Sequence, residues 1–319
     1  SAFAQLTYDL SDQLSLMASG RYIHETNKAH QPTLTAPVNL KEQKFLPAAT
    51  LTYKLDGGGN VYLRYARGFK AGGIVPVTNL AVFPNPRTQG GIFGGETIDT
   101  FEAGVKAPLA GNKVNVSAAV FYNAYKDVHV AAHANATYQA QGVTIAVVNA
   151  GTTRTYGAEA SITARVAESL TVGASVAYLN AMYKDFFVPA NVVIDEIALS
   201  GTRMINAPEW QLSFNADLDQ PISDSLSLTG NVVAAHTSEV LWQASGLPGV
   251  LDDSTGNAFW LVNARMGIKA SDDKWALSVF ANNLFNAAYS TFGNSASGYG
   301  NLYNWGDPRV FGVEASFKF

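Results

Sequence analysis

The chain contains no cysteine among its 319 residues, which excludes a disulfide framework and any metal site built on thiolates. Charged residues are scarce, at 14%, against roughly 25% in an ordinary soluble protein. The net charge of −4 gives no basic field to attract nucleic acid, so nucleic acid is not an expected partner. No apolar run approaches the roughly 20 residues of a membrane-spanning helix. Such a chain can still cross a membrane as a β-barrel, because only the lipid face of a barrel is apolar.

Signatures of enzymes are missing as well. The sequence has no G-x-S-x-G nucleophile elbow, no G-x-x-x-x-G-K-[ST] phosphate loop and no H-E-x-x-H zinc motif. His129 and His133 are four residues apart, a spacing that suits a metal on a helix. We interpret them instead as polar residues where a strand enters a loop. The sequence therefore predicts no enzyme, no catalytic residues, no cofactor and no metal site.

What the sequence does have is strict alternation of apolar and polar residues over short segments, the pattern of β-strands. In the last strand Phe311, Val313 and Phe317 alternate with Glu314 and Lys318. A slip of one residue would turn Glu314 and Lys318 toward the apolar side, where a lysine near the bilayer midplane costs about 2–4 kcal/mol. The register of such a strand is therefore well specified.

About thirteen amphipathic strands are predicted in this way. They lie near residues 2–9, 13–25, 43–55, 60–69, 97–108, 112–128, 153–166, 169–183, 208–219, 225–238, 258–270, 273–283 and 308–319. Aromatic residues near the strand ends are expected in the interfacial girdles of a barrel. They are Tyr8, Tyr53, Tyr62, Tyr65, Tyr122, Tyr125, Trp210 and Trp275.

The connections between these strands alternate in length. Tight turns such as residues 56–60 and 271–273 are followed by long segments. The long segments lie near residues 26–42, 70–96, 129–152, 184–207, 239–257 and 284–307. A soluble sandwich has no reason to place every long loop at one end, whereas outer-membrane barrels have short periplasmic turns and long extracellular loops. The predicted fold is therefore all-β, an antiparallel transmembrane β-barrel.

The two ends of the sequence bear on how much of the barrel is present. Residues 1–8 read as a strand and lack the features of a signal peptide, so we expect a mature chain or a fragment. Bacterial single-chain barrels have an even number of strands with both ends periplasmic. The first strand here reads as descending, so we expect an ascending partner strand outside this sequence. An extra strand within a long loop would raise the count to about fourteen.

Several stretches resemble TonB-dependent outer-membrane receptors. They are VYLRYARGFKAGG at 61–73, ETIDTFEAGVK at 96–106, NAG at 149–151 with YGAE at 156–159, APEW at 207–210, NLFNAAY at 283–289, GDPR at 306–309 and the terminal Phe319. They cover most of the chain in the family's order. Asn286 departs from the pattern, because the family usually has Asp there. The GFKAGG form at 68–73 is most similar to the siderophore-receptor branch.

The resemblance implies a barrel of about 22 strands whose lumen holds an amino-terminal plug. Residues 1–319 are then expected to be the carboxy-terminal portion of the barrel domain, without the plug. The implied function is TonB-dependent transport of a scarce, bulky nutrient, a ferric siderophore first of all, across the bacterial outer membrane. The implied partners are the TonB–ExbB–ExbD energy-transducing complex, acting through the plug region, and outer-membrane lipid and lipopolysaccharide.

Ligand contact is expected in the long loops, where aromatic faces and a cation would suit a flat, anionic ferric chelate. Packing of these aromatics on each other is the alternative interpretation. The predicted ligand-binding residues are Arg87, Phe93, Tyr299, Tyr303 and Trp305. Arg21, Glu102, Glu159 and Arg265 are expected on the lumen wall, paired with one another or with a plug.

Two other functions remain open from the sequence. A passive diffusion porin of about fourteen strands needs no plug, but the inward faces here lack a dense ring of charges. A translocator or adhesion barrel would use its long loops for partners, but the chain shows no passenger segment.

Overall fold

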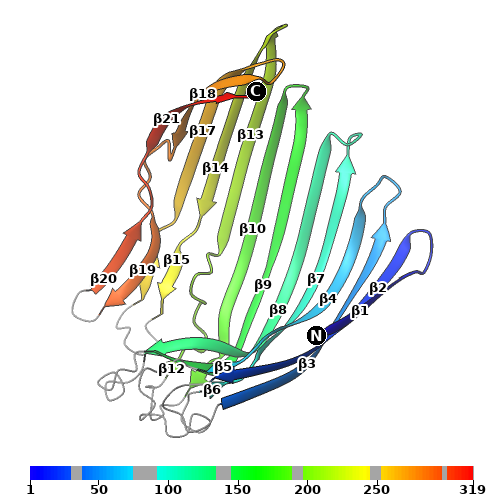
Figure 1. The fold of residues 1–319 in the computed structure, drawn as a ribbon, viewed down its shortest axis with the longest axis vertical. Helices are drawn as coiled ribbons and strands as arrows, with labels where there is room; N and C mark the ends of the chain where they lie inside the picture. The colour runs from blue at the N-terminus through cyan, green and yellow to red at the C-terminus, as the bar shows by residue number, and fades with distance from the viewer. Residues whose placement is uncertain are drawn as a thin grey trace.

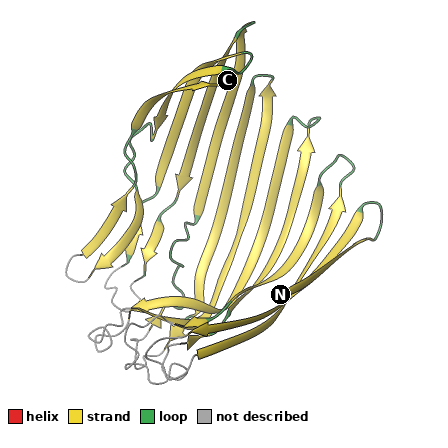
Figure 2. Cartoon of the chain, in the orientation of Figure 1, coloured by secondary structure: helices red, strands yellow, loops and turns green. Residues whose placement is uncertain are grey.

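The computed structural model describes residues 1–29, 38–74, 92–133, 145–188, 197–244, 253–296 and 300–318. They form one antiparallel sheet of 13 strands in up-and-down order (Figure 1). The strands in sheet order are β1 (Ala2–Asp9), β2 (Leu14–Ala29), β3 (Val38–Lys54), β4 (Asn60–Lys70), β7 (Glu96–Leu109), β8 (Val114–His133), β9 (Ile145–Ala167), β10 (Leu170–Asp185), β13 (Trp210–Ser223), β14 (Leu226–Thr237), β17 (Phe259–Ala270), β18 (Trp275–Asn282) and β21 (Val310–Phe317). Figure 2 shows strands and loops only, and none of the described residues belongs to a helix that could cross a bilayer.

The thirteen predicted strands are confirmed, but several are longer than predicted. The ladder between β8 and β9 continues through the pair His129 and Asn149 to the end of β8 at His133. The interpretation of His129 and His133 as loop residues is therefore wrong. Alternation marks only the part of a strand that has an apolar face, so it does not detect the extension beyond that face.

The long connections contain short hairpins where the sequence analysis expected only loops. They pair β5 (Gly73–Ile74) with β6 (Ile92–Phe93), β11 (Phe187–Val188) with β12 (Ile197–Ala198), β15 (Val240–Gln243) with β16 (Ser254–Gly256) and β19 (Ser290–Ala296) with β20 (Gly300–Trp305). All of these hairpins lie at one end of the sheet, and the short turns lie at the other (Figure 1). The predicted separation of long and short connections is confirmed.

The turn between β17 and β18 illustrates how a short connection is closed. The Lys274 backbone N–H donates to Asp272 Oδ1 at 3.2 Å, and its ammonium lies 3.1 Å from Asp272 Oδ2. The hydrogen bond from the Lys274 ammonium has the larger effect and that from the Lys274 backbone N–H the next, and both hold the pKa of the Asp272 carboxyl below its usual range. Asp273 takes up the left-handed conformation that the turn needs, with φ of 54°.

One face of the sheet is continuously apolar. Neighbouring strands place Leu63, Ala103, Val120 and Ala158 directly opposite one another, and the next row toward the long connections is aromatic. This aromatic row consists of Tyr65, Phe101, Tyr122 and Tyr156. Large apolar side chains stay exposed here, with Leu63 at 56% and Val120 at 57%, as on the lipid face of a barrel.

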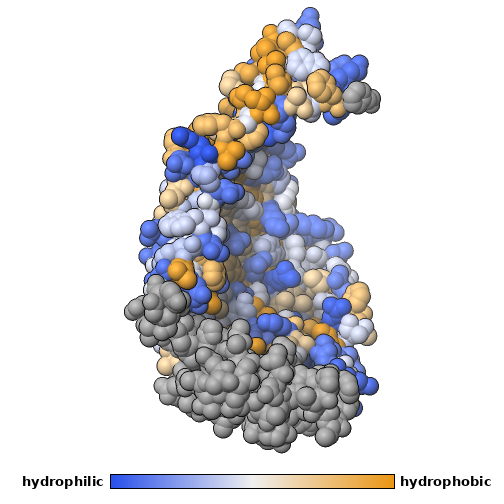
Figure 3. Space-filling model, turned by 60° about the vertical axis from the view of Figure 1, so that its left-hand side comes forward, coloured by the Kyte–Doolittle hydropathy of each residue, from blue (hydrophilic) through white to orange (hydrophobic). Residues whose placement is uncertain are grey.

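The other face is polar and lines the hollow of the curved sheet (Figure 3). Here Arg64 lies opposite Glu102, and the Tyr62 hydroxyl donates to Glu102 Oε1 at 2.7 Å. Tyr125 is on this face too, because it is an odd number of residues from Tyr122 along β8. The prediction that Tyr62 and Tyr125 join the lipid-facing girdle is therefore wrong. Position near a strand end does not decide the face, whereas alternation does.

The wall is one sheet thick, so little of it is buried. Among the described residues the largest fully buried side chains are those of Phe186, Leu199 and Ser254, and all three lie at the end with the long connections. β1 and β21 are the edge strands, so the described sheet is curved but not closed. The fold is thus a segment of barrel wall, with a small packed region at one rim.

Candidate functional site

The rim with the long connections carries two of the predicted ligand-binding residues on one hairpin strand. Tyr303 and Trp305 are two positions apart on β20, so their side chains leave the same face. Their ring centroids are 6.1 Å apart with the planes tilted by 49°. Trp305 is 64% exposed, whereas Tyr303 is half-buried. The pair offers an aromatic surface at the rim, exposed on the Trp305 side.

Small residues hold this hairpin against its neighbours. Trp242 of β15 donates from Nε1 to Ser290 Oγ at 3.2 Å. Gly293 has no room for a side chain, because a Cβ there would lie 2.5 Å from Trp242 Cδ1, 2.6 Å from Ser254 Oγ and 2.9 Å from Tyr303 Cε1. The close approach of β15, β16 and β19 therefore sets where the Tyr303 ring lies.

Phe93 belongs to a different cluster at the same rim. Its ring packs edge-on against His129 at 4.8 Å between centroids. His129 is nearly buried, with its side chain 5% exposed, and its Nε2 lies 2.6 Å from the Gly94 carbonyl oxygen. The Asn149 side chain also forms hydrogen bonds with Gly94, the residue after Phe93. Contacts from β8 and β9 therefore fix the position of Phe93. His129 thus has a structural contact at this position.

The five predicted residues therefore do not form one observed site. Arg87 and Tyr299 lie outside the described residues. Phe93 lies in one cluster, and Tyr303 with Trp305 in another. Of the other loop aromatics, Tyr289 stacks on Phe259 at 4.8 Å, the packing role that the alternative interpretation expected. No group of three or more metal-ligating side chains occurs among the residues that the structure describes.

The polar face carries a hollow of about 480 Å³ on β4, β7, β8, β9, β10 and β13. Its polar lining consists of Tyr62, Glu102, Lys106, Ser117, Glu159, Ser161, Ser175, Gln211 and Ser213. Alternation indicated the inward direction of Glu102 and Glu159, but not that six strands bring these residues together. The four predicted wall residues are not paired with one another. Arg265 pairs with Glu314 at 2.7 Å, Arg21 donates to Ser1 and Glu102 accepts from Tyr62.

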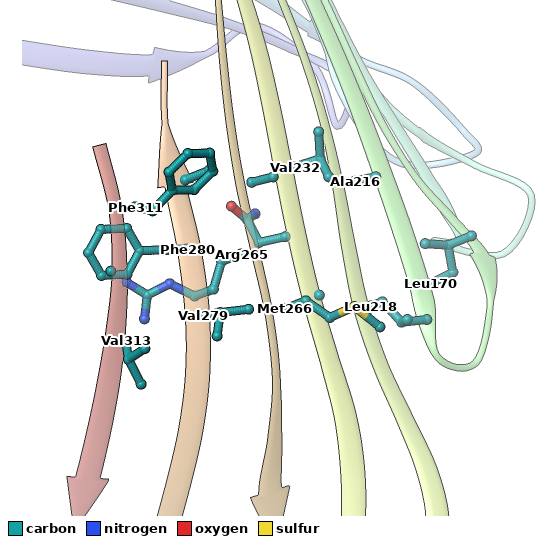
Figure 4. Close-up of a pocket in the computed structure, with 15 residues that line it drawn as sticks. Leu170, Ala216, Leu218, Val232, Arg265, Met266, Val279, Phe280, Phe311 and Val313 are labelled. Atoms are coloured by element: carbon teal, nitrogen blue, oxygen red, sulfur yellow. The ribbon is translucent and has the colours of Figure 1, made fainter. Parts of the chain in front are cut away.

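A larger hollow than this one lies elsewhere, on the apolar face of β10, β13, β14, β17, β18 and β21 (Figure 4). Its volume is about 700 Å³, and its side chains include Leu218, Met266, Val279 and Val313. The apolar side chains that make up most of this lining on the lipid face suit acyl chains rather than a charged chelate. We therefore regard the rim and the polar face, rather than this hollow, as the functional surfaces.

Comparison with known proteins agrees with this architecture. The family model described as TonB dependent receptor-like, beta-barrel, matches residues 1–284. The ferric yersiniabactin uptake receptor FyuA from Yersinia pestis has 18% identity and a TM-score of 0.78, with 99% of this chain and 45% of that chain covered. The ferric citrate transporter FecA has 17% identity and a TM-score of 0.73, with 99% and 44% covered.

The copper transporter OprC is also similar, with 15% identity, a TM-score of 0.71, and 99% of this chain and 46% of that chain covered. At these identities the solved structures establish the fold alone. The chain spans less than half of the length of each of these three proteins. The family match covers most of the sequence, and the 13-stranded sheet has the polar and apolar faces of an outer-membrane barrel. The chain belongs to the family of TonB-dependent receptors, and it forms part of the receptor β-barrel.

Proposed function

We propose that the protein is the barrel wall of an outer-membrane receptor that takes up a scarce, bulky nutrient, a ferric siderophore. The observation that carries this proposal is the wall itself, with an apolar face and a polar face kept in register across 13 strands. An aromatic pair, of which Trp305 is exposed, stands at the rim with the long connections. Such a wall separates lipid from a polar path and presents a binding surface on one side of the membrane.

The class of substrate is inferred from the chemistry of the rim. Flat, anionic ferric chelates suit aromatic faces combined with cations. Three solved proteins of this fold are described as a ferric yersiniabactin receptor, a ferric citrate transporter and a copper transporter, all of which handle metals. In this proposal Phe93, Tyr303 and Trp305 contact the chelate, together with Arg87 and Tyr299, which lie outside the described residues.

Transport of a bulky chelate against its gradient requires energy and a closed lumen. We propose that a plug in the lumen docks on the polar face and that the TonB–ExbB–ExbD complex of the inner membrane moves it. The hollow around Glu102 and Glu159 provides carboxylates, and Lys106 a cation, for such docking. The site of action is then the bacterial outer membrane.

Uptake by the full-length receptor tests the proposal. A strain lacking the receptor is grown under iron limitation with one ferric siderophore at a time, chosen from catecholate, hydroxamate and carboxylate classes. Restoration of growth by the receptor with one class, abolished without TonB, is the expected result. A receptor that conducts ions steadily in a planar bilayer and restores growth without TonB is a passive porin, and the proposal is then wrong.

The rim residues are tested by binding. Tyr303→Ala with Trp305→Ala is expected to weaken affinity for the transported chelate by about tenfold or more, because each aromatic contact contributes roughly 0.5–1.5 kcal/mol. Trp260→Ala is the matched control, since Trp260 lies on the apolar face and stacks on His236 at 4.9 Å. Unchanged affinity in the double variant contradicts the role of the pair.

A further inference from the structure

The end of β8 contacts the segment that carries Phe93 through one residue, His129. Its backbone N–H donates to Glu96 Oε2 at 3.0 Å, and its ring Nε2 lies 2.6 Å from the Gly94 carbonyl oxygen. The ring also meets the Phe93 ring edge-on, with 4.8 Å between the centroids. His129 therefore spans residues 93–96, where β6 ends and β7 begins.

The two ring nitrogens of His129 face different acceptors. A carbonyl oxygen can only accept, so Nε2 donates to Gly94 and carries the proton of the neutral ring. Nδ1 then has a lone pair, and it lies 3.9 Å from Glu96 Oε2. Two acceptors form no hydrogen bond. After a second proton binds to Nδ1, an approach of about 1 Å gives a charge-assisted hydrogen bond to the carboxylate. The bond from Nε2 to Gly94 is kept in that state.

Burial strengthens this interaction. The His129 side chain is 5% exposed and the Glu96 side chain 15%, so solvent and salt screen the two groups only weakly. Histidine is the side chain that ordinarily changes its charge between about pH 5 and 8. The ion pair with Glu96 is therefore present in mildly acidic medium, where the ring is an imidazolium. It is lost as the pH rises and the ring becomes neutral.

The neighbouring strands bring other ionisable groups near Glu96. They are Glu42 and Lys44 of β3, Lys70 of β4, and Tyr125, Lys126 and Asp127 of β8. Lys70 Nζ lies 3.9 Å from Glu96 Oε2, but the Lys70 side chain is 68% exposed and a surface pair of this kind contributes little. The residue that β9 presents here is Asn149, which is neutral. Among the described groups around Glu96, His129 is thus the side chain of the type that titrates near neutral pH.

We propose that His129 is a positioning residue of the ligand rim, and that a second proton on its ring closes an ion pair with Glu96 and fixes Phe93 more firmly. Nδ1 takes this proton from the solvent and donates it in a hydrogen bond to the Glu96 carboxylate. Phe93 responds because it packs on the same ring and because the next residue, Gly94, accepts a hydrogen bond from that ring. The inference rests on the proposed function for the role of Phe93 at the rim, but not for the effect of the proton.

Hydrogen exchange of the ligand-free, full-length receptor in detergent tests the effect. Protection factors of the amides at 93–96, corrected for the intrinsic pH dependence of exchange, are compared at about pH 5.5 and about pH 8. Protection in wild type is expected to be about three- to tenfold higher at the lower pH, because hydrogen bonds between charged groups are stronger than neutral ones. Equal protection of wild type at the two pH values overturns the inference without recourse to any variant.

Two variants remove the ion pair, one from each side. His129→Gln retains an amide that can donate to the Gly94 carbonyl but takes up no proton. Glu96→Gln retains an acceptor for the His129 N–H but has no charge. Both are expected to lose the pH step and to migrate as compact, folded species in unheated gels. A step that persists in either folded variant overturns the pairing of His129 with Glu96.

Two control variants are expected to keep the step. Lys70→Gln removes the other cation beside Glu96. His236→Gln removes a histidine of the apolar face, whose Nδ1 lies 2.9 Å from the Phe259 carbonyl oxygen. Loss of the step in Lys70→Gln would assign it to the Lys70–Glu96 pair, and its loss in His236→Gln would assign it to a distant titration. Either result overturns the role of His129.

Failure of this inference is distinguishable from failure of the proposed function, because no chelate enters the exchange measurement. A flat pH profile in a receptor that restores growth with a ferric siderophore overturns the role of His129 and leaves the transport proposal intact. A step of the expected size, lost in His129→Gln and Glu96→Gln, supports the effect of the proton even in a receptor that restores growth with none of the siderophore classes. That second result contradicts the transport proposal alone.

Discussion

Asn149 and Gly94 exchange two hydrogen bonds across the rim of the barrel wall. The Gly94 N–H donates to Asn149 Oδ1 at 2.6 Å, and Asn149 Nδ2 donates back to the Gly94 carbonyl at 2.9 Å. The same Nδ2 donates to the Asp127 carbonyl at 2.9 Å. Asn149 therefore fixes the backbone next to Phe93. It links β9 to β8 and to the segment between β6 and β7.

Replacing this amide tests its role. Asn149→Ala removes three hydrogen bonds to backbone groups and is expected to cost about 1–3 kcal/mol of local stability. Hydrogen exchange of the segment 92–96 should become faster, while exchange in the middle of β8 should not change. Asn149→Asp keeps the acceptor and loses both donors, so an intermediate effect is expected. Protection of 92–96 equal to wild type in both variants would contradict the assignment.

Gly293 provides a test of the packing that positions the aromatic pair. Gly293→Val pushes against Trp242, Ser254 and Tyr303, and overpacking of this kind costs about 1–3 kcal/mol. The variant should fold but bind the chelate more weakly, because the Tyr303 ring is displaced. Gly57→Ala is the control, since nothing lies within 4 Å of a Cβ there. Wild-type affinity in Gly293→Val would mean that the hairpin position does not matter for binding.

Neighbouring alanines on β8 test which face meets lipid. Ala118 lies in the apolar rows and Ala119 on the polar face, beside Glu159 and Ser117 in the polar hollow. Ala118→Lys is expected to destabilise the folded barrel by about 2–4 kcal/mol if it lies near the midplane. Ala119→Lys should be tolerated, because two carboxylates of the hollow face it. Urea unfolding in lipid vesicles measures both, and equal destabilisation would contradict the assignment of the faces.

Much of the wall could be predicted because alternation is a local property. The alternation of residues from Val114 to Tyr122 indicates which side chains face lipid. The tight turns then fix the register of the next strand. The prediction for Tyr62 and Tyr125 is wrong because aromatic type and nearness to a strand end do not decide the face of a residue, whereas its place in the alternation does. The parts of the strands beyond the apolar band, such as the part of β8 around His129, do not show this alternation.

The candidate site could be predicted only in part, since it depends on contacts between distant segments. The aromatic character of Tyr303 and Trp305 is visible in the sequence, whereas the room left by Gly293 for Trp242 and Ser254 depends on three strands meeting at the rim. Short-range patterns in the sequence cannot show such a meeting of distant strands.

The carboxy-terminal signature acts through two asparagines. Asn283 is 5% exposed, its Oδ1 accepts from the Ala287 N–H at 2.8 Å, and its Nδ2 donates to the carbonyls of Ala287 and Asp307 at 2.9 and 3.1 Å. Asn286 Oδ1 accepts from the Arg309 N–H at 3.0 Å, one residue before β21 begins. Together they tie the turn after β18 to the start of the last strand.

The departure of Asn286 from the family's usual aspartate can be explained by these bonds. Only the side-chain oxygen of Asn286 is used, and its φ of 54° is one that both Asn and Asp adopt more readily than other residues. Asn286→Asp is therefore expected to leave stability within about 0.5 kcal/mol of wild type. Asn283→Ala should instead cost about 2–3 kcal/mol, because it leaves two part-buried backbone carbonyls and an N–H without their side-chain partner. Thermal unfolding of the full-length receptor gives both values, and an Asn286→Asp variant as unstable as Asn283→Ala would mean that the Asn286 amide, not its oxygen, holds the last strand.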